Sequence, residues 1–109
     1  MAHHAMLIED EPHITEAIRF LLSRDGWQVS ALRDGGEAEA AVRAARPDLL
    51  ILDLMLPGRS GLEILSALRA DAEFAALPVM MLTAKGQGRD REAAERAGAN
   101  LFMAKQIGR

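Results

Sequence analysis

Leu49 to Gly61 reads LLILDLMLPGRSG. The apolar run before Asp53 is short for a helix and is stopped by Pro57 and Gly58, so it predicts a strand buried on both faces of a parallel sheet. Asp53 then falls at the carboxyl end of that strand, the edge where ligands bind in open α/β sheets. A buried carboxylate without a partner is costly, so this position calls for partners from elsewhere in the chain.

Length and composition limit the classes of protein to consider. With 109 residues, the chain is expected to form one domain over residues 1–109, without an output domain. Half of the residues are apolar, 27% are charged and the net charge is −3, which indicates neither a nucleic-acid-binding nor a membrane surface. The chain has no cysteine, which excludes disulfides and thiolate chemistry and fits a cytoplasmic protein.

The N-terminus carries neither a secretory signal nor a stretch long enough to span a membrane. Residues 1–4, with His3 and His4, are expected to be a disordered or tag-like end rather than a metal site.

Strand and helix patterns alternate along the chain. The expected strands are 5–8, 27–32, 49–53, 79–82 and 101–103, and the expected helices are 14–22, 38–45, 62–68 and 89–97. Ser60 followed by Glu63 is a capping box, and Asp34, with Glu37 three residues on, is an N-cap candidate. Strict alternation predicts a doubly wound α/β fold with a five-stranded parallel sheet.

Polar residues follow four of these strands and are expected to meet at one edge of the sheet. Three carboxylates, those of Glu9, Asp10 and Asp53, repel one another unless a cation neutralises them. Hard oxygen ligands favour Mg²⁺, or Mn²⁺. Lys105 adds a fixed positive charge and Thr83 a hydroxyl donor. The set suits transfer of a phosphoryl group to a carboxylate.

Four motifs together resemble the receiver domain of two-component response regulators. They are Glu9 to Pro12, Asp53 to Gly58, Leu82 to Ala84, and Lys105, and the resemblance runs from about Met6 to Lys105. It implies a flavodoxin-like sheet with strand order 2-1-3-4-5. It also implies that the domain is a phosphoacceptor rather than an enzyme, with a sensor histidine kinase or phosphotransfer protein and a downstream effector protein as partners.

The resemblance also implies a role for each site residue. Asp53 is the phosphoacceptor, Lys105 supports the transfer, and Thr83 moves to bond the phosphoryl group. Phe102 stands at the aromatic switch position and turns inward with Thr83. The expected Mg²⁺ ligands are Asp10, Asp53 and the Met55 backbone carbonyl, with Glu9 assisting through water.

The chain departs from the family pattern at three places. Gln106 follows Lys105 where a proline with a cis peptide bond is usual, so a trans peptide bond is expected here. The family pattern therefore does not fix the direction of the Lys105 ammonium. In the family that the chain resembles, the side chains at the positions of Met55 and Lys85, the latter two residues after the threonine, influence the water that hydrolyses the phosphoaspartate. Met55 cannot orient a water by hydrogen bonding, so slow self-dephosphorylation is predicted. The final fifth helix is missing, because the chain stops at Arg109. The apolar face then left uncovered predicts a homodimer or marginal stability.

Two other functions compete with a phosphorylated receiver. A phosphohydrolase of the haloacid-dehalogenase type needs a second acid two residues after its nucleophile, where this chain has Met55. A degenerate receiver would keep the fold and act as a phosphorylation-independent interaction or dimerisation module. The missing proline and fifth helix favour this second alternative.

Overall fold

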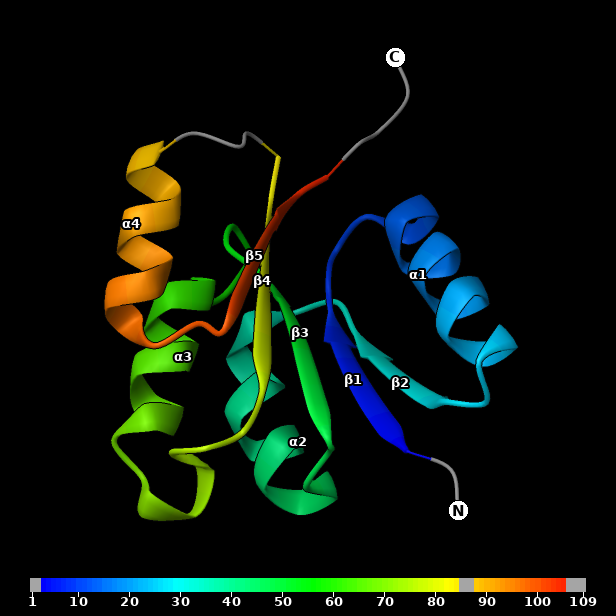
Figure 1. Cartoon of the computed structure of the whole chain (residues 1–109), viewed down its shortest axis with the longest axis horizontal. Helices are drawn as coiled ribbons and strands as arrows, with labels where there is room; N and C mark the ends of the chain where they lie inside the picture. The colour runs from blue at the N-terminus through cyan, green and yellow to red at the C-terminus, as the bar shows by residue number, and fades with distance from the viewer. Residues whose placement is uncertain (1–2, 85–87, 106–109) are drawn as a thin grey trace.

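The computed structural model describes residues 3–84 and 88–105. Five strands form one parallel sheet in the order β2-β1-β3-β4-β5 (Figure 1). They are β1 (His4–Ile8), β2 (Gln28–Leu32), β3 (Leu49–Asp53), β4 (Val79–Thr83) and β5 (Leu101–Ala104). The doubly wound fold and the strand order 2-1-3-4-5 are therefore confirmed.

Four α-helices and two 3-10 turns connect the strands within the described residues. They are α1 (Pro12–Arg24), η1 (Gly35–Glu37), α2 (Ala38–Ala45), α3 (Gly61–Arg69), η2 (Ala72–Phe74) and α4 (Gly88–Ala97). Helices α2, α3 and α4 lie on one side of the sheet and α1 lies on the other (Figure 1). Between residues 3 and 105, outside the gap at 85–87, there is no fifth α-helix.

Local signals account for the helix starts. Pro12 occupies the first turn of α1, where its missing N–H costs no hydrogen bond. The capping box before α3 is confirmed: the Glu63 amide donates to Ser60 Oγ at 3.2 Å, and the Ser60 amide donates to Glu63 Oε1 at 3.3 Å. The N-cap candidate at Asp34 is also confirmed: its side chain accepts the Gly36 amide and opens the 3-10 turn η1, which precedes α2.

The core divides into two clusters because strand residues alternate between faces. Leu50 and Leu52 of β3 pack toward α2, α3 and α4, whereas Ile51 packs toward α1. The larger cluster also contains Met81 of β4. All four side chains are fully buried, each contributing about 1.5–3 kcal/mol. Strand β3 is therefore covered on both faces and holds Asp53 at a rigid end.

The face of β5 on the α1 side is open in the part of the chain that the structure describes. Leu101 is 61% exposed and Met103 51% exposed, and none of the residues of α1 is fully buried. A hollow of about 190 Å³ lies between α1 and β5, lined by Ile14, Ala17, Ile18, Leu82, Met103, Ala104 and Lys105. The expected uncovered apolar face is present.

The expectation of a disordered or tag-like end at residues 1–4 is wrong for His3 and His4. His4 is the first residue of β1, and its amide donates to Asp48 Oδ2 at 2.7 Å. The Gln28 amide donates to the His3 carbonyl at 2.8 Å. These contacts come from tertiary pairing, which local composition does not reveal. Met1 and Ala2 lie outside the described residues. Among residues 3–84 and 88–105, no helix has the length and apolarity needed to cross a bilayer.

Candidate functional site

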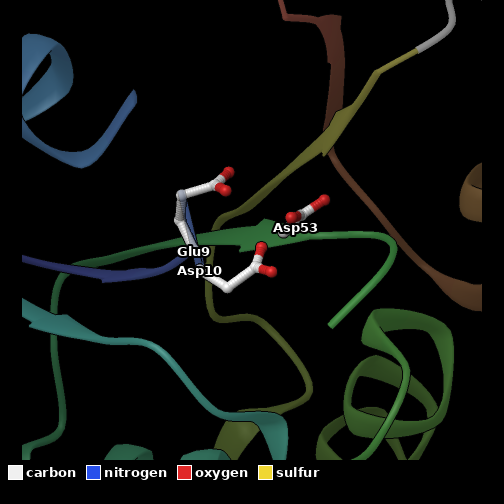
Figure 2. Close-up of side chains that lie close together, drawn as sticks. All are labelled: Glu9, Asp10 and Asp53. Atoms are coloured by element: carbon white, nitrogen blue, oxygen red, sulfur yellow. The ribbon is translucent and has the colours of Figure 1, made fainter. Parts of the chain in front are cut away.

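Three carboxylates meet at the carboxyl end of the sheet (Figure 2). Glu9 and Asp10 directly follow β1, and Asp53 ends β3. These two strands are parallel neighbours, with Ile8 opposite Leu52, so their ends coincide. One oxygen from each carboxylate lies within 4.8 Å of the others. Glu9 and Asp53 are buried, and Asp10 is half-buried.

Lys105 reaches this cluster from the end of β5. Its ammonium donates to Asp53 Oδ2 and to Glu9 Oε2, both at 3.1 Å, and lies 3.7 Å from Glu11 Oε1. The Lys105 amide also donates to the Thr83 carbonyl at 2.7 Å. This bond holds the Lys105 backbone against the end of β4. The side chain is therefore aimed at Asp53. Its peptide bond to Gln106 lies outside the described residues.

Burial controls the protonation of this cluster. It raises the pKa of both Glu9 and Asp53, and the hydrogen bonds from Lys105 offset only part of that rise. Burial alone would lower the pKa of Lys105, but its hydrogen bonds to Glu9 and Asp53 outweigh burial and raise it. The ammonium is thus held charged, while the carboxyl groups still favour a proton or a further cation.

The residues present fit a hard divalent cation. The three acids bring up to three negative charges against the single charge of Lys105. Within the described part of the chain, Glu9 Oε1 is buried and accepts no hydrogen bond, although Lys105 Nζ lies 3.1 Å from it. A cluster of carboxylate oxygens with excess negative charge suits Mg²⁺ or Mn²⁺. Asp53 Oδ1 accepts the Met55 amide at 3.2 Å, so the Met55 backbone lies against the same carboxylate.

Thr83 and Phe102 lie at the neighbouring strand ends. Thr83 ends β4, is buried, and donates its hydroxyl to Asp90 Oδ2 of α4 at 3.4 Å. It lines a hollow of about 250 Å³ together with Leu54, Met55, Ala84 and Asp90. Phe102 is half-buried on the α4 side of the sheet, with the Arg91 guanidinium 5.2 Å from its ring centre. Lys85 lies outside the described residues.

Two further residues lie at this edge that were not predicted from the sequence. Glu11 contributes an oxygen near Lys105, and Asp90 contacts Thr83. The acidic run from Glu9 to Glu11 is the signal that could have indicated Glu11. Asp90 carries no local signal, because its contact depends on how α4 packs against the sheet.

Fold and site together define a flavodoxin-like domain with an acidic strand edge. The family model described as the response regulator receiver domain matches residues 5–109, and the chain belongs to that family. Receiver domains are the phosphoacceptor domains of two-component systems.

Known proteins of the family are similar over nearly the whole chain. The phosphate regulon transcriptional regulatory protein PhoB of Rhizobium meliloti is 39% identical over 91% of this chain, which corresponds to 44% of PhoB. The chain spans less than half the length of the curated relatives that it matches.

Two solved structures have the same fold. The Mn²⁺-bound form of response regulator Rcp1 has a TM-score of 0.90 and 25% identity, over 97% of this chain and 83% of Rcp1. The phosphorylated cyanobacterial phytochrome response regulator RcpA has a TM-score of 0.89 and 29% identity, over 96% of this chain and 81% of RcpA.

Proposed function

We propose that Asp53 is the phosphoacceptor of this receiver domain. The observation that carries the proposal is the contact between Lys105 Nζ and Asp53 Oδ2 at 3.1 Å, beside two further carboxylates. In the transfer, a carboxylate oxygen of Asp53 forms a bond to phosphorus while the bond from phosphorus to the donor's imidazole nitrogen breaks. The donor is a phosphohistidine of a sensor histidine kinase or phosphotransfer protein, and its imidazole leaves neutral after taking up a proton.

Each neighbouring residue has a proposed part in this step. Lys105 orients the Asp53 carboxylate and neutralises charge on the phosphoryl oxygens. Asp10, Asp53 and the Met55 carbonyl would hold Mg²⁺, or Mn²⁺, with Glu9 acting through water. A bound cation would offset the repulsion among the carboxylates and neutralise charge on the phosphoryl group. The Mn²⁺-bound state described for Rcp1 supports this choice of cation.

The output is proposed to be a change in protein–protein contacts. Thr83 leaves Asp90 to bond the phosphoryl group, which alters the attachment of α4. Phe102 follows Thr83 inward and changes its contact with Arg91. The surface of α4 and β5 would then be read by a downstream effector protein. We also propose a cytoplasmic location, which a chain without cysteine suits.

The open face between α1 and β5 supports a homodimer as a further proposal. Leu101 and Met103 expose apolar surface there, beside the hollow against α1. Sedimentation at increasing concentration is expected to show dimers, and Leu101→Lys with Met103→Lys to shift them toward monomers. A stable monomer at high concentration would rule out this dimer.

Phosphorylation is tested by incubating the protein with Mg²⁺ and acetyl phosphate and measuring its intact mass. We expect the gain of one phosphoryl group, lost in Asp53→Asn and kept in Asp25→Asn, whose aspartate is exposed at the end of α1. No gain in the unmodified protein would overturn the proposal in favour of the degenerate module. Turnover of phosphate esters would favour the phosphohydrolase.

A further inference from the structure

The loop that leaves Asp53 is held by a second loop from the other side of the site. Residues 54–60 connect β3 to α3, and the turn Asp34–Gly36 follows β2. The Gly35 amide donates to the Pro57 carbonyl at 2.9 Å. Within the turn, Asp34 Oδ1 accepts the Gly36 amide at 2.6 Å. The two segments are thus joined through backbone atoms, and the Asp34 carboxylate fixes the shape of the turn.

The two loops pack too closely for side chains between them. A Cβ atom added to Gly35 would overlap the backbone carbonyl oxygen of Arg59. A Cβ atom added to Gly58 would overlap Asp34 Oδ1, and Gly58 also has φ +85°, a conformation that favours glycine. Arg59 is held from a further element, because its guanidinium donates to Glu39 Oε1 of α2 at 2.7 Å.

Met55 lies within this clamped loop, where its amide donates to Asp53 Oδ1 at 3.2 Å but its side chain does not anchor it. Its side chain is 73% exposed, so the residues on either side set its backbone position. Before it, the Leu54 amide donates to the Leu82 carbonyl at 2.8 Å, and the Leu54 carbonyl accepts the Gly61 amide at 2.9 Å. After it, Leu56 packs against the core. The attachment to the Asp34–Gly36 turn begins at the next residue, Pro57.

We propose that the Asp34–Gly36 turn positions the Met55 backbone carbonyl for the divalent cation. The turn fixes the loop from Pro57 to Arg59, and the core and β4 fix it at Leu54 and Leu56. With its amide also held on Asp53 Oδ1, Met55 would then need no reorganisation of its backbone when the cation binds. Asp34 and Gly35 are positioning residues, since neither is expected to touch the cation. The inference rests on the proposed function, in which this carbonyl is a metal ligand.

The test uses Asp34→Ala, Asp34→Asn and Gly35→Ala, with Asp48→Ala as the matched control. Asp48 likewise accepts a backbone amide, that of His4 at 2.7 Å, but it precedes β3 and so lies at the opposite edge of the sheet from the acid cluster. Mn²⁺ affinity is measured by calorimetry. Hydrogen exchange of the Met55 amide is measured without metal, and thermal unfolding reports the stability of each variant.

Asp34→Ala and Gly35→Ala are expected to weaken Mn²⁺ binding about tenfold, as loss of a partner that orients a ligand does, and to speed exchange at Met55. Asp34→Asn keeps an oxygen acceptor and stays near the unmodified protein. Asp48→Ala lowers stability without changing either readout. Equal weakening in Asp48→Ala, or unchanged Mn²⁺ binding and Met55 exchange in Asp34→Ala, would overturn the inference.

Two further outcomes are also decisive. If the unmodified protein binds no Mn²⁺, the proposed cation site is wrong. Met55 exchange in Asp34→Ala against Asp48→Ala then decides the positioning role alone. If Gly35→Ala fails to fold, the comparison of Asp34→Ala with Asp34→Asn decides it, because these two variants differ in the oxygen acceptor.

Discussion

Lys105 Nζ lies 3.1 Å from Asp53 Oδ2 although 52 positions separate the two residues in the sequence. The contact forms because β3, β4 and β5 run parallel and end at one edge of the sheet. The ammonium also contacts Glu9 at 3.1 Å, so one lysine serves two buried carboxylates. The charges of Glu9 and Asp53 are therefore both balanced by this one ammonium.

Replacing Lys105 by methionine keeps the length of the side chain and removes its charge. Glu9 and Asp53 then remain buried without their ammonium partner, so the free energy of unfolding without metal is expected to fall by about 3 kcal/mol. Urea denaturation near neutral pH measures the loss. Arg89→Ala, at an exposed position, serves as the control and should change stability by no more than about 0.5 kcal/mol. Unchanged stability in Lys105→Met would contradict the role of this contact.

Mg²⁺ should stabilise the protein more as the pH rises through the raised pKa values of Glu9 and Asp53. Their ordinary values are 4.5 and 3.8, and burial raises both in the folded protein. The folded state therefore binds more protons than the unfolded state in that window, so metal-free stability falls as the pH increases. Mg²⁺ competes with these protons, and its stabilising effect has the opposite pH dependence.

Thermal unfolding with and without Mg²⁺, at about pH 5 and about pH 7.5, measures this difference. We expect a larger Mg²⁺-induced rise in melting temperature at the higher pH. Asp53→Asn should reduce the Mg²⁺-induced rise in melting temperature at both pH values. An Mg²⁺ effect that is constant across the range would show that these carboxyl groups are not its site.

Periodicity and strand order explain how much of this site could be predicted from the sequence. The buried run before Asp53 and the alternation of strands with helices predicted a common edge for Glu9, Asp10, Asp53, Thr83 and Lys105. The structure places all five there. Parallel strands bring their ends together whatever lies between them, so residues distant in sequence were predicted to be neighbours.

Contacts that depend on how two elements pack were not predicted. His4 looked like part of a terminus, because a strand's first residue has no periodicity and its partner Asp48 is 44 positions away. The contact of Asp90 with Thr83 depends on the packing of α4 against the sheet. Asp34 was correctly predicted to be a cap. Its close packing against Gly58, on which the proposed role of the turn depends, is a tertiary contact that the local sequence does not indicate.

Arg69 is expected to contribute to stability more than any exposed arginine. Its guanidinium donates to the Gly98 carbonyl at 2.8 and 3.0 Å, to the Phe74 carbonyl at 2.9 Å and to Asn100 Oδ1 at 2.9 Å. It thereby joins the end of α3 to η2 and to the turn between α4 and β5. Arg69→Ala leaves these acceptors without a charged donor and should cost about 2–3 kcal/mol.

Chemical denaturation of Arg69→Ala and Arg96→Ala separates this role from a general loss of charge. Arg96 is exposed near the end of α4, so its removal should change stability by less than about 0.5 kcal/mol. Equal losses in the two variants would contradict the prediction.

The phosphorylated protein is expected to lose its phosphoryl group slowly because of Met55. This side chain lines the hollow beside Thr83 and is largely exposed, but a thioether is a poor hydrogen-bond partner for the water that attacks the phosphoaspartate. Met55→Asn supplies an amide there and should speed hydrolysis by about tenfold, less than a full general base contributes. Met55→Leu, which keeps a similar volume without a polar group, should keep the slow rate. Intact mass followed over time after removal of acetyl phosphate measures both, and equal rates in Met55→Asn and Met55→Leu would show that this position does not orient the water.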